Sequence, residues 1–236
     1  MQIVPPIHPE QHALENLLAA RGLTADWLNT SNGDPYSQPN IARYSIIEAS
    51  KIVPFHYRAA QPSLPAVRNW VDTLASQALT AAAERGSHVA SVLRGPSLLL
   101  LGVTGVGKTH EAYGALRDLA ITGVLANWTV TTAADLYAAL RPRHGVDSET
   151  EFRRYRDSRV LLVDDLGAAK PSEFTEDINF RLINHRYERH LPTLVTSNVR
   201  PRELRDRLGD RVASRLNEMC QRISMKGEDR RRGEAA

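Results

Sequence analysis

The chain has 236 residues and a net charge of +3, and its 42% hydrophobic and 24% charged residues are typical of a globular protein, which excludes the disordered and fibrous classes. Its single cysteine, Cys220, excludes a disulfide framework and a cysteine-based zinc site, as expected for a cytoplasmic protein. No apolar run approaches the roughly 20 residues of a membrane-spanning helix, and the first residues lack a secretory signal, so we expect no membrane partner.

The first 65 residues predict a small, mainly helical segment interrupted by prolines, since nine of the thirteen prolines lie before residue 97. Helices are predicted over 10–21 and 24–28. Three leucines share one face of the first helix: Leu14, Leu17 and Leu18. Prolines at 54, 62 and 65 predict an extended linker.

From residue 67 onward, apolar residues at regular spacing predict longer elements. A helix is predicted over 67–84. Helices and apolar strand-like runs then alternate, with strands over 98–101, 126–130, 160–163 and 193–196, and helices over 108–121, 133–140, 152–156, 173–190 and 201–208. This alternation predicts an α/β fold in which a parallel sheet is sandwiched by helices.

Residues 102–109 read Gly-Val-Thr-Gly-Val-Gly-Lys-Thr and lie between a predicted strand and a predicted helix, which is the context of a phosphate-binding P-loop. Backbone N–H groups and the helix N-terminus would hold phosphate oxygens. Lys108 would reach the β- and γ-phosphates of ATP, and the Thr109 hydroxyl would bind Mg²⁺. The predicted nucleotide-binding residues are Thr104, Gly105, Val106, Gly107, Lys108, Thr109 and His110.

Two later strands end in polar residues. The run Val-Leu-Leu-Val over 160–163 is followed by Asp164 and Asp165, and another apolar strand is followed by Asn198. Because ligands bind beyond the carboxyl ends of parallel strands, these side chains should meet the P-loop. Asp164 would hold Mg²⁺, and Asp165 would orient or deprotonate the attacking water. Asn198 would contact the γ-phosphate or that water, or would cap its strand.

Arg211 and Arg215 are four residues apart, so they share one face of a predicted helix. One of them offered to a neighbouring subunit's γ-phosphate would stabilise transition-state charge. The alternative is a pair of surface salt bridges. The whole stretch 200–232 is basic, with eleven Lys or Arg against six Asp or Glu, which suits a polyanion or a solvated surface.

The ordered set of motifs resembles the DnaC/IstB group of AAA+ ATPases. The resemblance spans about residues 66–227, which we assign to the ATPase domain, with 1–65 as a partner-binding segment and linker. It implies that Lys108 and Thr109 belong to Walker A, Asp164 and Asp165 to Walker B, and Asn198 to sensor 1. It implies Arg215 as the arginine finger, with Arg211 as the alternative.

About twenty residues follow Arg215, which are too few for the helical lid of most AAA+ proteins. We therefore expect a fold without a full C-terminal lid. Residues 228–236 are expected to form a basic tail without regular structure, although Arg230 or Arg231 could substitute in part for a lid residue.

The resemblance also implies function. Members of this group load a replicative helicase onto single-stranded DNA or assist a transposase on duplex DNA, using ATP and Mg²⁺ in a homo-oligomer. We expect a loader that contacts its helicase through residues 1–60. The three leucines and Trp27 would dock on the helicase or pack on the chain's own ATPase domain. The alternatives are a transposase helper, a nucleotide-binding scaffold with negligible hydrolysis, and a P-loop kinase.

The predicted DNA contacts are less specific. Basic and aromatic residues lie together between the second strand and Asp164, a combination that suits phosphate contact and base stacking. Trp128 lies in a predicted strand and is assigned to the core, and Tyr137 is expected to be half-buried. Arg141 and Arg143 remain as the candidate contacts to single-stranded DNA.

Overall fold

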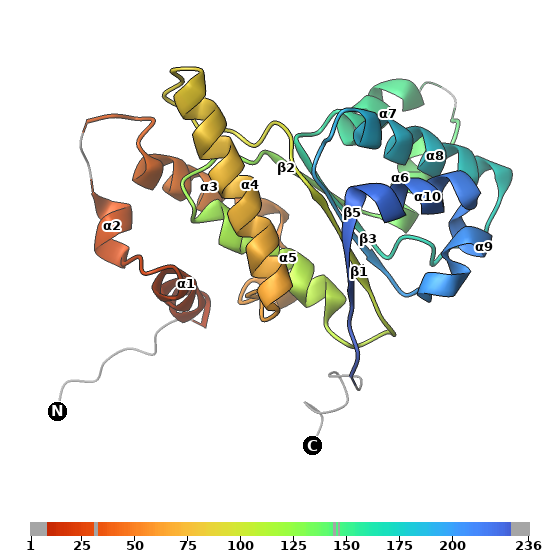
Figure 1. Ribbon diagram of the computed structural model, residues 1–236, viewed down its shortest axis with the longest axis horizontal. Helices are drawn as coiled ribbons and strands as arrows, with labels where there is room; N and C mark the ends of the chain where they lie inside the picture. The colour runs from red at the N-terminus through yellow and green to blue at the C-terminus, as the bar shows by residue number, and fades with distance from the viewer. Residues whose placement is uncertain (1–8, 31–32, 144, 146, 228–236) are drawn as a thin grey trace.

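The computed structural model describes residues 9–30, 33–143, 145 and 147–227. Its described part contains a five-stranded sheet with the strand order β2-β3-β4-β1-β5 (Figure 1). All four strand pairings are parallel, which confirms the predicted architecture. The strands are β1 (Ser97–Leu101), β2 (Trp128–Thr132), β3 (Val160–Asp164), β4 (Thr193–Ser197) and β5 (Cys220–Ser224).

Helices cover both faces of the sheet. The N-terminal half supplies one layer, formed by α1 (Pro9–Ala20), α2 (Ala25–Asn29), α3 (Gln38–Ile52), the 3-10 turn η1 (Phe55–Tyr57), α4 (Pro65–Glu84) and α5 (Lys108–Ala120). The other layer consists of α6 (Ala133–Leu140), α7 (Ser148–Arg156), α8 (Glu173–Glu188), the 3-10 turn η2 (Pro201–Glu203), α9 (Leu204–Leu208) and α10 (Asp210–Met219). Among the described residues, no helix combines the length and apolar character that crossing a membrane requires.

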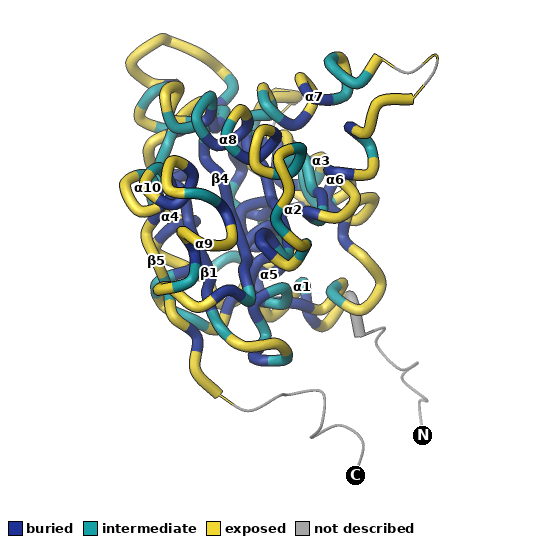
Figure 2. The backbone as a smooth tube through the Cα atoms, turned by 90° about the vertical axis from the view of Figure 1, so that its right-hand side faces the viewer, coloured by how far each residue is buried: buried dark blue, intermediate teal, exposed yellow. Residues whose placement is uncertain are grey.

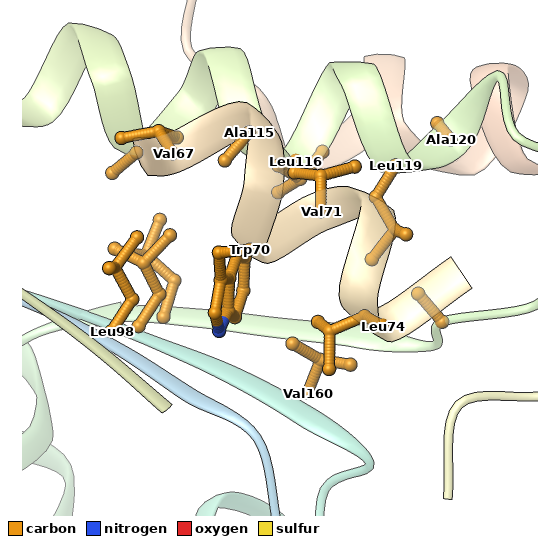
Figure 3. Close-up of a cluster of buried hydrophobic side chains, with 14 of the residues drawn as sticks. Val67, Trp70, Val71, Leu74, Leu98, Ala115, Leu116, Leu119, Ala120 and Val160 are labelled. Carbon is orange, nitrogen blue, oxygen red and sulfur yellow. The ribbon is translucent and has the colours of Figure 1, made fainter. Parts of the chain in front are cut away.

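The inner strands β1, β3 and β4 are buried along their whole length, because helices cover both of their faces (Figure 2). Leu98 and Leu100 pack with α4 and α5 on one side, while Leu99 and Leu101 pack with α6, α8 and α10 on the other. Figure 3 shows the first side, where Trp70 of α4 lies between the sheet and α5. The Trp70 indole N–H donates to the carbonyl of Pro96, so this buried ring leaves no donor unpaired.

Besides the 3-10 turn η1, which lies in the expected linker, two elements were not predicted. The first is α3, a 15-residue helix in the segment that the prolines suggested would be broken. Pro39 lies at its first turn, where a missing N–H costs nothing, so this proline begins the helix instead of interrupting it. Its apolar residues Ile41, Ala42 and Ala49 are buried.

The second is β5, which pairs only with β1 and forms one edge of the sheet. Its sequence Cys-Gln-Arg-Ile-Ser is largely exposed and therefore lacks the apolar run by which the inner strands were recognised. Boundaries also differ: β2 begins at Trp128 and not at 126, and the helix predicted over 201–208 divides into η2 and α9.

Helices α1 and α2 pack on α3 and on the end of α5 of their own chain. Leu17 and Leu18 are buried in a cluster with Ala42 of α3 and Ile121, the residue after α5. Arg21 makes a two-pronged ion pair with Asp118 of α5, with distances of 2.6 and 2.8 Å. Of the two alternatives for these leucines, the structure therefore shows packing on their own domain.

The linker before α4 runs along the P-loop helix α5. Glu111 is fully buried there and accepts hydrogen bonds from the backbone N–H groups of Ser63 and Leu64. One turn on, Gly114 lets the linker approach so closely that a β-carbon would lie 2.6 Å from the Gln61 backbone. These contacts join residues 61–64 to the helix that begins at the P-loop.

Arg186 of α8 is fully buried at the end of the sheet opposite the P-loop, where β3 and β4 start. Its guanidinium donates to the Thr193 hydroxyl at 2.7 Å and to backbone carbonyls of Ser158 and Pro192 at 2.8 and 2.7 Å. Burial lowers the pKa of Arg186 to about 9. The guanidinium thus joins the starts of β3 and β4, which sets their relative position.

We expect Arg186→Met to lower the free energy of unfolding by about 3–5 kcal/mol, because several buried acceptors lose their donor. Arg181→Met, on the same helix in an exposed ion pair with Glu149, should cost under about 1 kcal/mol. Urea unfolding followed by circular dichroism measures both values. Equal costs for the two variants would contradict the structural role of Arg186.

Candidate nucleotide and magnesium site

The P-loop connects the end of β1 to the start of α5. Gly105 and Gly107 have φ values of +86° and +96°, the left-handed backbone region that favours glycine. Gly107 is the N-cap of α5, and no side chain caps the helix. The first N–H groups of α5 thus face the loop, which is the arrangement that binds phosphate.

The other predicted loop residues differ in exposure. Thr104 is exposed, His110 lies half-buried in the first turn of α5, and Val106 is buried in the core beneath the loop. Val106 would therefore contribute its backbone to a nucleotide. Gly102 is required by packing, because a β-carbon there would lie 2.6 Å from the carbonyl oxygen of Met225, just after β5.

Lys108 points into the loop. Its Nζ donates to the carbonyls of Gly102 and Val103, both at 2.9 Å, and to Asn198 Oδ1 at 2.5 Å. The ammonium group is buried and is held where phosphate oxygens would enter the loop. The P-loop and the end of β4 therefore meet, as the strand-end argument predicted.

Thr109 and Asp164 form the part of the site that fits Mg²⁺. The Thr109 hydroxyl donates to the Asp164 carboxylate at 3.1 Å, beside the phosphate cradle. Mg²⁺ prefers oxygen ligands and typically uses one or two protein groups together with substrate phosphates. Burial raises the pKa of Asp164 and the neighbouring Asp165 adds to this, while the hydrogen bonds from Thr196 and Thr109 and the charge of Lys108 act in the opposite direction.

Asn198 bridges the lysine and the second carboxylate. Its Oδ1 accepts from Lys108, and its Nδ2 donates to Asp165 Oδ1 at 2.8 Å. Asp165 has a left-handed backbone, with φ of +57°, which is unusual for a residue other than glycine. Three predicted site residues from three strand ends thus form one hydrogen-bonded chain.

Sequence reasoning missed Thr196. This buried residue of β4 donates its hydroxyl to Asp164 Oδ1 at 2.5 Å and accepts the backbone N–H of Asp165 at 2.9 Å. The available clue was a hydroxyl side chain directly after Leu194 and Val195, two positions before Asn198.

Arg211 and Arg215 do share one face of α10, which packs on α8. The Arg215 guanidinium stacks over the Tyr187 ring at 4.3 Å, and its Nε donates to Asn184 Oδ1 at 3.3 Å. The Arg211 guanidinium lies 5.4 Å from the centre of the Phe180 ring. Among the described residues, the polar and ring contacts of Arg215 are with α8 and α10 and not with the P-loop.

The candidate DNA contacts lie outside this site. Arg141 and Arg143 are exposed on the connection from α6 to α7, and Arg143 donates to the carbonyl of Ala138. Tyr137 is buried and donates to Asn179, while Trp128 is half-buried against Trp70. The basic tail, with Arg230 and Arg231, lies outside the described residues.

Comparisons with known proteins agree with this geometry. The family model of IstB-like ATP-binding proteins matches residues 66–235. The chain is 24% identical over 123 residues to the replicative helicase loader DnaC of Escherichia coli strain K12, across 51% of this chain and 49% of DnaC. It is 28% identical over 148 residues to the ATP-binding protein of insertion sequence IS21 from Pseudomonas aeruginosa, across 61% of this chain and 55% of that protein. The chain thus spans about half the length of the curated relatives it matches.

Solved structures share the fold. The crystal structure of the DnaC helicase loader superimposes with a TM-score of 0.58 and 23% sequence identity, covering 73% of this chain and all of that one. The AMPPCP-bound DnaA of Aquifex aeolicus gives 0.54 and 20%, covering 85% of this chain and 52% of that one. The likeness shows that the sheet and its helices have the same fold as these two proteins.

Substituting Lys108 tests the cradle. We expect Lys108→Ala to weaken binding of a fluorescent ATP analogue by at least about 30-fold, because a buried charge facing the phosphates is lost. Lys51→Ala, which removes an exposed lysine of α3, should leave the affinity unchanged. Retained affinity in a folded Lys108→Ala protein would place the nucleotide elsewhere.

Proposed function

The chain belongs to the family of IstB-like ATP-binding proteins and is an AAA+ ATPase, and from this premise we propose that it loads a replicative DNA helicase onto single-stranded DNA. The curated relative named as a replicative helicase loader supports the loader function. The ATP-dependent part of the proposal rests on one observation. Lys108, Asp165 and Asn198 meet beyond the carboxyl ends of the strands.

In this proposal each residue has a role in hydrolysis. The P-loop backbone and Lys108 bind the triphosphate, and Thr109 and Asp164 hold Mg²⁺, which neutralises phosphate charge when bound. Asp165 accepts a proton as water attacks the γ-phosphorus and the bond to the ADP oxygen breaks. Asn198 is hydrogen-bonded to that carboxylate and to Lys108. It therefore connects the group that activates water, Asp165, with the group that contacts the phosphate, Lys108.

An arginine from a second copy completes the site in the proposed mechanism. Arg215 supports this assignment because it is ordered by Tyr187 and Asn184 yet remains partly exposed. A guanidinium pre-oriented in this way pays little to meet developing charge. Arg211 is the alternative, and either choice makes a homo-oligomer necessary for full activity.

Mixing two inactive variants tests completion in trans. We expect Arg215→Ala to reduce the steady-state ATPase rate by about 10³-fold or more, the range found for arginine fingers. Lys108→Ala should be inactive because it lacks nucleotide. A mixture of the two should regain activity, since a subunit with an intact site meets a neighbour with an intact arginine.

The assay is run with and without oligo-dT, and Arg211→Ala serves as the matched control on the same helix face. Asp165→Asn should also regain activity when it is mixed with Arg215→Ala, which keeps an intact base, but should stay inactive when it is mixed with Lys108→Ala, because neither subunit then has an intact site. Recovery with Arg211→Ala, but not with Arg215→Ala, would reverse the finger assignment. A wild-type protein that hydrolyses no ATP in either condition would instead favour the scaffold alternative.

The partner-binding part of the proposal now rests on a different surface from the three leucines. Several large apolar side chains on α3 and the turn after it are exposed, including Phe55 at 74% and Ile47 at 56%. Exposed apolar side chains grouped in one segment are typical of protein-binding surfaces. We therefore propose that the helicase contacts α3 and η1, which lie within the expected residues 1–60. DNA contact is proposed separately, at Arg141 and Arg143.

A transposase helper is the second candidate, because the chain is also similar to the ATP-binding protein of insertion sequence IS21. The nucleotide site does not separate the two functions, since both would couple ATP to an assembly on DNA. The partner and the form of DNA do separate them.

Copurification distinguishes the candidates. The chain is coexpressed with the replicative helicase, or with a transposase, encoded in the same genome. We expect helicase capture that is lost in Phe55→Glu and Ile47→Glu, because a charge would be buried in an apolar contact. Leu93→Glu, which alters an exposed leucine far from α3 in sequence, is the control. Capture of the transposase alone would establish the helper function.

A further inference from the structure

Thr196 lies where the two carboxylates of the nucleotide site meet. We propose that it is a positioning residue that holds Asp164 and Asp165 in the geometry needed for Mg²⁺ binding and water activation. The proposal rests on the proposed ATPase function and adds to it a residue that lies in the strand leading to Asn198 and was not predicted as a site residue.

The sheet brings Thr196 to this point. In the parallel register of β3 and β4, Leu162 lies opposite Leu194 and Val163 opposite Val195. The next pair in this register is Asp164 and Thr196. Side chains alternate between faces of a sheet, so Thr196 follows Leu194 on the face covered by α5, the helix that carries Thr109. Asp164 therefore lies between two hydroxyl groups, from β4 and from α5.

The hydrogen-bond pattern determines the direction of the Thr196 hydroxyl. The Asp165 backbone N–H can only donate, so Thr196 Oγ1 accepts from it at 2.9 Å. The hydroxyl proton then points to Asp164 Oδ1 at 2.5 Å. This bond fixes the rotation of the Asp164 side chain.

The second bond holds the turn in which Asp165 lies. Asp165 adopts a left-handed backbone, and such strain persists only where surrounding contacts determine it. Two bonds to residue 196 do so: its hydroxyl accepts the Asp165 N–H, and its carbonyl accepts the Leu166 N–H at 2.9 Å. The turn directs the Asp165 carboxylate to Asn198 instead of into the opposite face of the sheet.

Thr196→Val removes the hydroxyl while keeping the branched shape. It therefore tests the two hydrogen bonds of the hydroxyl, to Asp164 and from the Asp165 N–H, and not the packing. We expect a fall in kcat of about 100-fold, the size of effect that small displacements of reacting groups produce. The Mg²⁺ concentration for half-maximal ATPase should rise. Thr196→Ser, which keeps the hydroxyl, should recover most of the rate.

The matched control is Thr193→Val on the same strand. Thr193 is equally buried and its hydroxyl is also doubly bonded, to Arg186 and to the Leu191 carbonyl, but it lies at the end of β4 away from the P-loop. This variant should lose stability without a change in Mg²⁺ dependence. It therefore separates loss of a buried hydrogen bond from loss of positioning.

Nucleotide binding supplies a readout that does not depend on turnover. A fluorescent ADP analogue is titrated in EDTA and at increasing Mg²⁺ concentrations. We expect Thr196→Val to bind ADP normally in EDTA and to lose most of the gain in affinity that Mg²⁺ gives the wild type. If Thr196→Val does not fold, Thr196→Ala is measured in its place.

The outcomes are distinguishable. A Thr196→Val protein that matches Thr193→Val in kcat and Mg²⁺ dependence, with both destabilised, would overturn the positioning role and leave a structural one. Wild-type protein without ATP hydrolysis would overturn the proposed function, yet the Mg²⁺-dependent ADP titration would still decide the role of Thr196.

Discussion

The nucleotide site depends on the parallel register of β1, β3 and β4. Because these strands run in the same direction and lie side by side, the residues that follow each of them lie at the same end of the sheet. The P-loop, the two aspartates and Asn198 come from chain positions far apart, and only this register brings them into hydrogen-bonding distance. The buried leucines and valines that hold the strands together are thus as necessary for the site as its polar groups.

The opposite ends of the strands are held in place by hydrogen bonds and not by apolar packing. Arg186 replaces apolar packing with a set of hydrogen bonds to the chain before β3 and β4. A buried guanidinium is costly unless its donors are satisfied, and here backbone carbonyls satisfy them. The two ends of the strands therefore have different roles. The end at Arg186 fixes where β3 and β4 start, and the opposite end carries the left-handed backbone of the P-loop and the uncapped N-terminus of α5, which suit phosphate.

The P-loop helix connects the site to the N-terminal segment. Glu111, Gly114 and Asp118 lie along one side of α5 and contact the linker or α1. The N-terminal helices are consequently part of the packed structure and not a separate module on a flexible tether. A movement of α5 on nucleotide binding would be passed directly to the helices whose exposed apolar side chains we assign to partner contact.

The sequence by itself was sufficient for the inner strands, the P-loop and the position of Lys108, Asp164 and Asp165 beside it, because buried parallel strands and phosphate loops have local patterns. It was insufficient for α3 and β5, whose patterns were masked by prolines and by the polar composition of an edge strand. Only the tertiary structure decided that Leu17 and Leu18 pack inward and that Thr196 joins the two aspartates. Both depend on which distant segments become neighbours, and local residue spacing carries no information about that.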